Sequence, residues 1–156
     1  MDSKVILVDL DLRRPMTHNI FGLEKENGIS DYILNNAKKE DIIKNSGIRN
    51  LDIITSGFIP PYPSEILASE KMGNFIEELK QTYSYVLIDT PPIIAVTDAL
   101  ILGRLVDQLV LVISIDITDR DIIKRTKEML KNIDIEISGV IANGIDVHKY
   151  YSGYSY

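Results

Sequence analysis

Five short apolar runs, alternating with segments of helical periodicity, are the feature that most limits how this chain can fold. The runs are rich in Val, Ile and Leu and do not alternate with polar residues, which is typical of strands covered on both faces. They are VILV (5–8), LDII (51–54), YVLI (85–88), LVLVI (109–113) and SGVIA (138–142). Strands that alternate with helices predict a mostly parallel α/β sheet with right-handed crossovers and helices on both faces.

Three segments between these runs have helical spacing of their apolar residues, at 64–83, 96–105 and 119–133. Gly73 is expected to interrupt the first of them. Thr118, followed by Asp121, fits a capping box that begins the last. Three prolines in the loop TSGFIPPYPSE (55–65) are expected to stiffen it and to end the preceding strand.

Composition excludes several classes of protein. The chain has 156 residues, about one domain, and no cysteine, so it has no disulfide framework and no thiolate site. Its net charge of −6 argues against binding to the phosphate backbone of nucleic acids. No signal peptide or apolar segment of membrane-spanning length is present, so the sequence predicts a soluble, cytoplasmic protein.

Acidic residues follow two of the predicted strands. Asp9 and Asp11 come at the end of the first run, and Asp89 ends the third. Ligands of open α/β sheets collect at the carboxyl ends of the strands. Carboxylates gathered there repel one another unless a cation or a catalytic role compensates, and Mg²⁺ bound by one or two carboxylates fits that arrangement.

Two chemistries use such acids, and one of them is phosphoryl transfer to an aspartate in a receiver domain. That fold needs a Ser or Thr after the fourth strand, which Ser114 could provide, and a Lys after the fifth. The fifth run is followed by ANGID, with no Lys before Lys149. The sequence therefore fits a receiver domain poorly, and nucleotide-dependent phosphoryl transfer is the other possibility.

Several motifs resemble the bacterial tyrosine kinases, the BY-kinases of capsule and exopolysaccharide synthesis. VILVDLDLRRP resembles their Walker A′ motif and YVLIDTPP their Walker B motif. GFIPPYPSEIL, FGLEKENGISDYI and GVIANGID are similar to further segments of that family, in the family's order. The resemblance runs from about Lys4 to Tyr156 and implies a P-loop-NTPase-like fold of the type found in partition ATPases.

The resemblance also implies roles for individual residues. Asp9 would lie near the incoming tyrosine hydroxyl and help to accept its proton, and Asp9 and Asp11 would be the catalytic residues. Asp11 and Asp89 would hold Mg²⁺ beside ATP, and Asn143 could hydrogen-bond the adenine. Arg13 and its neighbour Arg14 are expected to pair with surface acids rather than with phosphate.

The end of the chain, YYSGYSY, resembles the family's autophosphorylation tail. We therefore expect residues 1–149 to form the α/β domain and 150–156 a flexible tail, phosphorylated at Tyr150, Tyr151, Tyr154 and Tyr156. No glycine is followed by Lys, so the Walker A motif G-x-x-x-x-G-K-[ST] is absent. The expectation is a kinase-domain fragment that lacks the P-loop strand and is inactive by itself.

The family resemblance implies partners as well. They are a membrane adaptor of polysaccharide export, a complete kinase subunit or a second copy of the chain, and a cognate tyrosine phosphatase, with recruitment to the inner face of the plasma membrane. Two alternatives remain open from the sequence. One is a partition-type P-loop ATPase, and the other is a non-catalytic binding module whose tail is phosphorylated.

Overall fold

The computed structural model describes residues 3–115 and 117–145, so the tail at 150–156 lies outside the described residues. The chain forms two compact units, divided between Leu105 and Val106. Each unit contains a sheet of its own.

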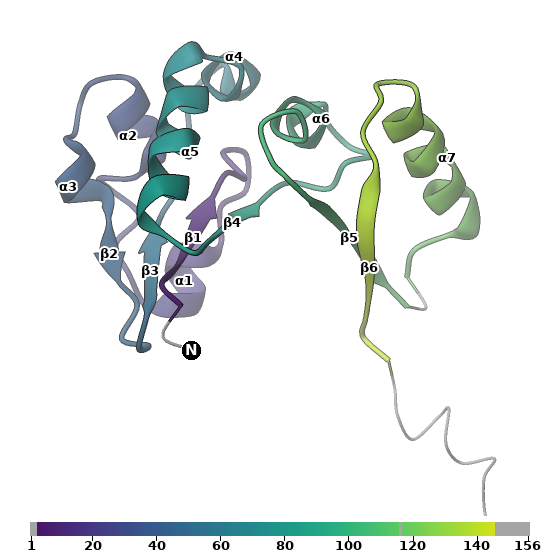
Figure 1. The fold of residues 1–156 in the computed structure, drawn as a ribbon, viewed down its shortest axis with the longest axis horizontal. Helices are drawn as coiled ribbons and strands as arrows, with labels where there is room; N and C mark the ends of the chain where they lie inside the picture. The colour runs from purple at the N-terminus through teal and green to yellow at the C-terminus, as the bar shows by residue number, and fades with distance from the viewer. Residues whose placement is uncertain (1–2, 116, 146–156) are drawn as a thin grey trace, which may run out of the picture. The chain divides into compact units, whose positions relative to one another are not determined.

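The first unit is built on a four-stranded sheet with the order β2-β3-β1-β4 (Figure 1). Strand β1 (Val5–Asp9) pairs in parallel with β3 (Leu51–Ile54) on one side and with β4 (Tyr85–Asp89) on the other. A two-residue strand, β2 (Lys44–Asn45), pairs antiparallel with β3. The structure thus confirms the predicted parallel pairing, and β2 is an addition too short for any sequence pattern to indicate.

Helices connect these strands, and most of them are only about one turn long. They are α1 (Thr17–Phe21), α2 (Ile29–Ile33), α3 (Lys39–Ile42), α4 (Pro63–Leu67), α5 (Glu70–Thr82) and α6 (Asp98–Leu102). Helix α5 packs its apolar face on the core, burying Met72, Phe75, Ile76 and Leu79. Because a single helical turn is unstable alone, the short helices depend on this packing.

The predicted helix over 64–83 is two helices, α4 and α5. The sequence analysis expected an interruption at Gly73, and this position is wrong. The break falls at Ala68 and Ser69, where the Ser69 hydroxyl accepts the backbone N–H of Met72 at 3.2 Å and begins α5. Gly73, expected to interrupt the helix, lies inside α5. Side-chain capping therefore decides where the helix begins, and the glycine does not.

Two glycines bring segments far apart in the sequence into backbone contact. The N–H groups of Ile29 and Ser30 donate to the carbonyls of Thr55 and Ser56 at 2.8 and 3.0 Å. A Cβ placed on Gly28 would lie 2.1 Å from the Gly57 nitrogen. This approach fixes the start of α2 against the loop that leads to α4.

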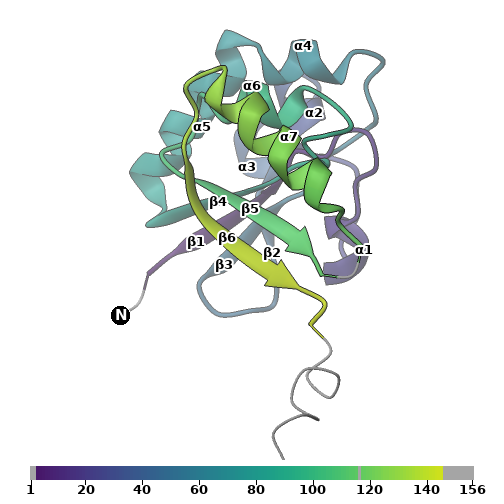
Figure 2. The same cartoon turned by 90° about the vertical axis from the view of Figure 1, so that its right-hand side faces the viewer.

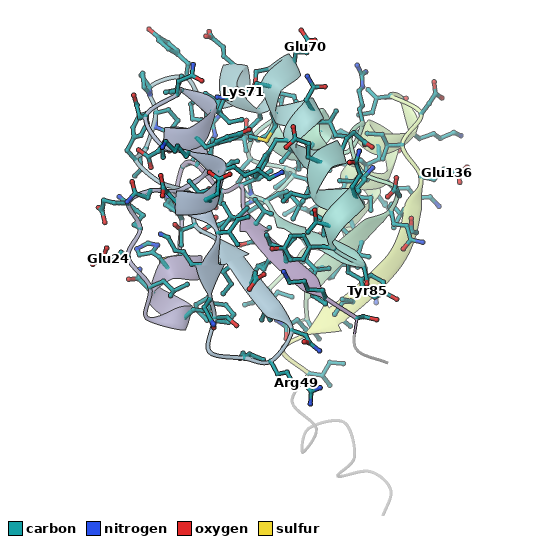
Figure 3. All side chains as sticks on the ribbon, turned by 60° about the vertical axis from the view of Figure 1, so that its left-hand side comes forward. Glu24, Arg49, Glu70, Lys71, Tyr85 and Glu136 are labelled. Carbon is teal, nitrogen blue, oxygen red and sulfur yellow. The ribbon has the colours of Figure 1, made fainter. Side chains whose placement is uncertain are left out.

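A lysine from α5 closes the opposite end of α2. The Lys71 ammonium, labelled in Figure 3, donates to the carbonyls of Tyr32 and Ile33 at 2.5 and 3.2 Å and to the Asn35 side chain at 2.6 Å. A cation at a helix C-terminus complements the helix dipole and satisfies carbonyls that have no partner within the helix. Helices α2 and α5 are thereby joined.

The second unit is a parallel pair of strands with one helix. Strand β5 (Leu109–Ser114) pairs with β6 (Ile137–Asn143), and α7 (Arg120–Lys131) runs along the pair (Figure 2). The predicted strands are confirmed, but the expected cover on both faces is wrong here, since Val112 is 60% exposed, and it is wrong as well for β4 of the first unit, where Leu87 is 52% exposed. The predicted cap at Thr118 is also wrong, because the Asp119 side chain caps α7.

No helix among the described residues, 3–115 and 117–145, is both long and apolar enough to cross a membrane. The longest, α5, spans Glu70–Thr82 and carries charged residues on its exposed side.

Candidate functional site

The carboxyl ends of β1 and β4 bring the predicted acids together. The two strands run in parallel register with Asp9 opposite Asp89, and the Leu10 N–H donates to the Asp89 carbonyl at 2.9 Å. Asp11 follows two residues after Asp9, in the loop that leads to α1. The three acids predicted from the sequence therefore lie at one edge of the first unit's sheet.

Asp9 is buried, with no exposed surface, and braces the loop that follows it. Its Oδ1 accepts the Asp11 N–H and its Oδ2 accepts the Thr17 N–H, both at 3.2 Å. Burial raises the pKa of the Asp9 carboxyl; bonds from Thr17 oppose this effect, and the charge of Asp89 adds to it. Sequence reasoning missed Thr17, which ties the start of α1 to this carboxylate.

Asp11 is only partly buried, and its carboxylate is held by backbone groups. Its Oδ1 accepts the N–H groups of Arg13 at 3.1 Å and Arg14 at 2.9 Å. Two N–H donors on one oxygen fix the carboxylate relative to the turn, as in other Asx turns. Asp11 thus presents a carboxylate of fixed direction at the sheet edge.

Asp89 is exposed as a residue, yet enough protein surrounds its carboxyl group to change its titration. Desolvation raises the pKa of the Asp89 carboxyl, the negative charge of Asp11 raises it further, and a bond from the Thr90 backbone opposes both. The negative charge of Asp11 beside the Asp89 carboxylate marks a place where a cation would relieve repulsion.

Mg²⁺ fits this pair of acids by the chemistry of the donors. Mg²⁺ takes oxygen ligands, and it is usually held by one or two carboxylates together with water and phosphate oxygens. Asp11 and Asp89 supply two such carboxylates. Within residues 3–115 and 117–145, no group of three or more His, Cys, Asp or Glu side chains is placed to hold a metal ion. The described residues offer two carboxylates, Asp11 and Asp89, for such an ion, and their role as Mg²⁺ ligands stays a prediction.

Arg13 makes a bidentate ion pair with an acid that is 85 positions away in the sequence. Its Nε donates to Asp98 Oδ2 at 2.7 Å and its Nη2 to Asp98 Oδ1 at 3.0 Å. Ser64, at the start of α4, donates to Asp98 Oδ1 at 2.8 Å and accepts from Arg13 Nη2 at 3.1 Å. The sequence analysis predicted that Arg13 pairs with a surface acid. The pairing with an acid is confirmed, but the predicted location is wrong, because Asp98 is fully buried.

Sequence reasoning missed Asp98 and Ser64 as partners of the site. Asp98 was visible only as an acid near the start of the 96–105 segment, where acids are common for reasons of helix polarity. Ser64 belongs to the segment PSEIL, whose spacing indicates a helix start and nothing more. Neither signal points to Arg13, since a long-range pair leaves no pattern in a single sequence.

Asn143 belongs to the second unit, at the end of β6. Its side chain is exposed, its Oδ1 accepts the Gly144 N–H at 2.9 Å, and its carbonyl accepts the Ile115 N–H at 2.8 Å. The amide nitrogen of the side chain makes no described hydrogen bond. Binding of adenine by Asn143 stays a prediction, as do the roles of Asp9, Asp11 and Asp89. The predicted phosphorylation sites at 150–156 lie outside the described residues.

Comparison with known proteins agrees with this geometry. The family profile described as an AAA domain matches residues 1–138. The tyrosine-protein kinase YwqD of Bacillus subtilis (strain 168) is 40% identical over 154 residues, which are 99% of this chain and 65% of YwqD. The chain spans about two thirds of such shorter relatives and 21% of the tyrosine-protein kinase etk of Escherichia coli (strain K12).

Solved structures extend the match to three dimensions. The kinase domain of Escherichia coli tyrosine kinase ETK has a TM-score of 0.88 and 35% sequence identity, covering 92% of this chain and 56% of that one. The septum site-determining protein MinD from Pyrococcus horikoshii, solved with Mg-ADP, has a TM-score of 0.70 over 90% of this chain and 58% of its own. At 24% identity, MinD shows only the shared fold. Together these matches show that the chain belongs to the bacterial tyrosine-kinase family.

Proposed function

We propose that this chain supplies the acidic half of a protein-tyrosine kinase site, which transfers phosphate from ATP to tyrosine hydroxyls. The observation that carries the proposal is the juxtaposition of Asp9, Asp11 and Asp89 at the ends of two paired strands. Sites of phosphoryl transfer work mainly by positioning and electrostatics, and carboxylates that hold Mg²⁺ are a recurring part of them.

The proposed roles follow from the surroundings of each acid. A tyrosine hydroxyl with a pKa of about 10 is a weak nucleophile, so Asp9, whose proton affinity is raised, would accept its proton. Asp11 and Asp89 would hold Mg²⁺, which when bound offsets negative charge on the ATP phosphates. Asn143, with its side-chain N–H₂ exposed, would donate to the adenine edge.

The phosphate cradle is the part that the 156 residues do not contain. Backbone amides of a G-x-x-x-x-G-K-[ST] loop bind phosphate, and no such sequence occurs among them. We therefore expect the 156-residue polypeptide to bind Mg-ATP weakly and to be inactive by itself. The cradle would come from residues outside this sequence or from another chain.

The tyrosines at 150, 151, 154 and 156 are the proposed phosphate acceptors. Only Ser and Gly separate them, a composition that suits transfer from a neighbouring subunit. Each phosphate adds a charge of about −1.5 to −2 and would loosen an assembly by repulsion. The proposed setting is the inner face of the plasma membrane, in capsule or exopolysaccharide synthesis, with a membrane adaptor and a cognate tyrosine phosphatase as partners.

Intact-mass spectrometry after incubation with Mg-ATP tests the proposal. The chain is incubated alone and with a complete bacterial tyrosine kinase, and the tail is compared with a variant that has Phe at 150, 151, 154 and 156. We expect no phosphate on the chain alone and several phosphates with the complete kinase, lost in the Phe variant. Phosphate on the chain alone would contradict the need for an external cradle.

Substitution of the acids tests whether the chain contributes to catalysis or is only a substrate that is phosphorylated. Asp11→Asn is expected to reduce phosphorylation when the chain shares a site with a subunit that supplies the cradle. Asp134→Asn, which changes an exposed acid of the second unit, is the matched control. If Asp11→Asn behaves like Asp134→Asn, the chain is a phosphorylatable binding module and its acids do no chemistry.

A further inference from the structure

The cluster formed by Arg13, Asp98 and Ser64 joins three segments of the first unit. Arg13 comes from the loop between β1 and α1, Ser64 from the start of α4, and Asp98 from the start of α6. The Asp98 carboxylate has no exposed surface and accepts three hydrogen bonds from the other two residues. A buried carboxylate is tolerated only with such partners, so the cluster holds together as a unit.

We propose that Arg13 and Asp98 are positioning residues, which lock the loop after Asp11 to the loop after Asp89 and so set the spacing of these two carboxylates. The first link is direct, because the Arg13 N–H donates to Asp11 Oδ1 at 3.1 Å while its side chain holds Asp98. The second link is the chain itself, since residues 90–97 connect Asp89 to Asp98.

The chemistry of the pair supports a lock rather than an incidental contact. A bidentate Arg–carboxylate pair fixes direction as well as distance, which a single ammonium contact does not. Bonds from Arg13 and Ser64 lower the pKa of the Asp98 carboxyl despite its burial, so it stays ionised and paired at neutral pH. Two of the three guanidinium nitrogens of Arg13, Nε and Nη2, are bonded within the protein in this way.

The two loops joined in this way each adjoin a carboxylate, Asp11 in one and Asp89 before the other, so the restraint bears on the spacing of these two groups. The value of this spacing for Mg²⁺ rests on the proposed function. The restraint itself does not, and the two are tested by different measurements.

Solvent exchange of backbone amides, measured by NMR on the 156-residue chain, tests the restraint. The Arg14 N–H, bonded to Asp11 Oδ1, reports on one loop, and the Ala95 N–H, bonded to the Pro92 carbonyl at 3.0 Å, reports on the other. We expect Asp98→Asn to speed exchange at Arg14 several-fold, and Arg13→Gln to speed exchange at Ala95 several-fold. Effects confined to the loop that carries the substitution would overturn the proposal.

Milder and matched variants keep the test decisive. Ser64→Ala keeps the ion pair and should produce a smaller effect in the same direction at both loops. Arg13→Lys keeps the charge but loses the bidentate hydrogen bonding, and its exchange rates should lie between those of wild type and Arg13→Gln. Lys39→Gln, which breaks the exposed pair of Lys39 with Glu78 between α3 and α5, should change neither loop. An equal response to Lys39→Gln would show general loosening and contradict the lock.

Mn²⁺ alone, used as a paramagnetic probe, separates this inference from the proposed function. In the wild-type chain, Mn²⁺ should broaden the amide signals of Asp11 and Thr90 together, and Arg13→Gln should require several-fold more Mn²⁺ for equal broadening. Coupled exchange without broadening would support the lock and contradict the metal role. Broadening with the same Mn²⁺ requirement in Arg13→Gln would contradict the lock and leave the metal role standing.

Discussion

The two units are built from the same alternation of strands and helices, but the central strand β1 of the first unit and the strand β5 of the second are buried to different degrees. In the first unit Ile6 and Val8 of β1 are 0% and 3% exposed, with helices packed around them. In the second unit Val110 and Val112 of β5 are 49% and 60% exposed. Strand β4, which ends the sheet of the first unit, is exposed in the same way as β5, since Leu87 is 52% exposed. A run of Val, Ile and Leu therefore indicates a strand in both units, while its cover depends on whether the strand lies inside a sheet or at its end.

The largest difference between the units is expected from truncating the core of the first. Phe75 is 1% exposed and packs against Tyr32 in a tilted arrangement, with ring centroids 4.7 Å apart. Phe75→Ala should lower the free energy of unfolding of the first unit by about 3–5 kcal/mol. Urea unfolding followed by amide NMR signals of β1 measures this loss. If the signals of β5 disappear at the same urea concentration as those of β1, the two units unfold together, which would contradict a separate stability for each unit.

The contact between Gly28 and Gly57 gives the next effect. Gly28→Ala would place a Cβ 2.1 Å from the Gly57 nitrogen and 2.4 Å from the Thr55 carbonyl oxygen, so the backbone has to move. We expect a loss of about 3 kcal/mol or more, measured by the same urea unfolding.

Gly73→Ala is the matched control for that substitution, since its nearest neighbour would be Leu105 Cδ2 at 3.8 Å, an ordinary contact. Because Gly73 lies inside α5, alanine there should raise the free energy of unfolding by about 0.5–1 kcal/mol. Equal losses in both variants would mean that backbone conformation, and not the close approach, governs Gly28.

These glycines also show what the sequence could and could not predict. The five strands are visible because each is a dense apolar run, and the acids Asp9, Asp11 and Asp89 are visible because they follow such runs. The Gly28–Gly57 contact and the Arg13–Asp98 pair join segments far apart in the chain, and no local pattern specifies them. The same limit explains β2, whose two residues form a strand only because β3 lies beside them.

The ion pair within the first unit should make its stability depend on pH. Asp98→Asn leaves Arg13 without its charged partner and should cost about 3 kcal/mol at pH 7. The pKa of the Asp98 carboxyl is lower in the folded chain than in the unfolded chain, where it is about 3.9. Its contribution is therefore complete above about pH 4 and is lost as the pH falls through the lower, folded value.

Urea midpoints of wild type and Asp98→Asn between pH 7 and pH 3 measure this dependence. The difference between the two chains matters, because Asp9 and Asp89 have raised pKa values and act in the opposite direction in both. We expect the difference to shrink below about pH 4. A difference that stays constant over the whole range would show that packing, and not charge, accounts for the cost.

The smallest expected effect is the sharpest test of the comparison, because one substitution can be made in both units. Val→Thr keeps the shape of the side chain and its preference for strands, and it exchanges a methyl group for a hydroxyl. At Val8 in β1, 3% exposed, the hydroxyl would be buried, and the cost should be about 1–3 kcal/mol. At Val112 in β5, 60% exposed, the hydroxyl stays hydrated, and the change should be within about 0.5 kcal/mol. Urea unfolding followed separately at β1 and β5 gives both values. Similar losses at the two positions would mean that β5 is covered in solution as fully as β1, and the contrast between the units would then be one of connectivity rather than of burial.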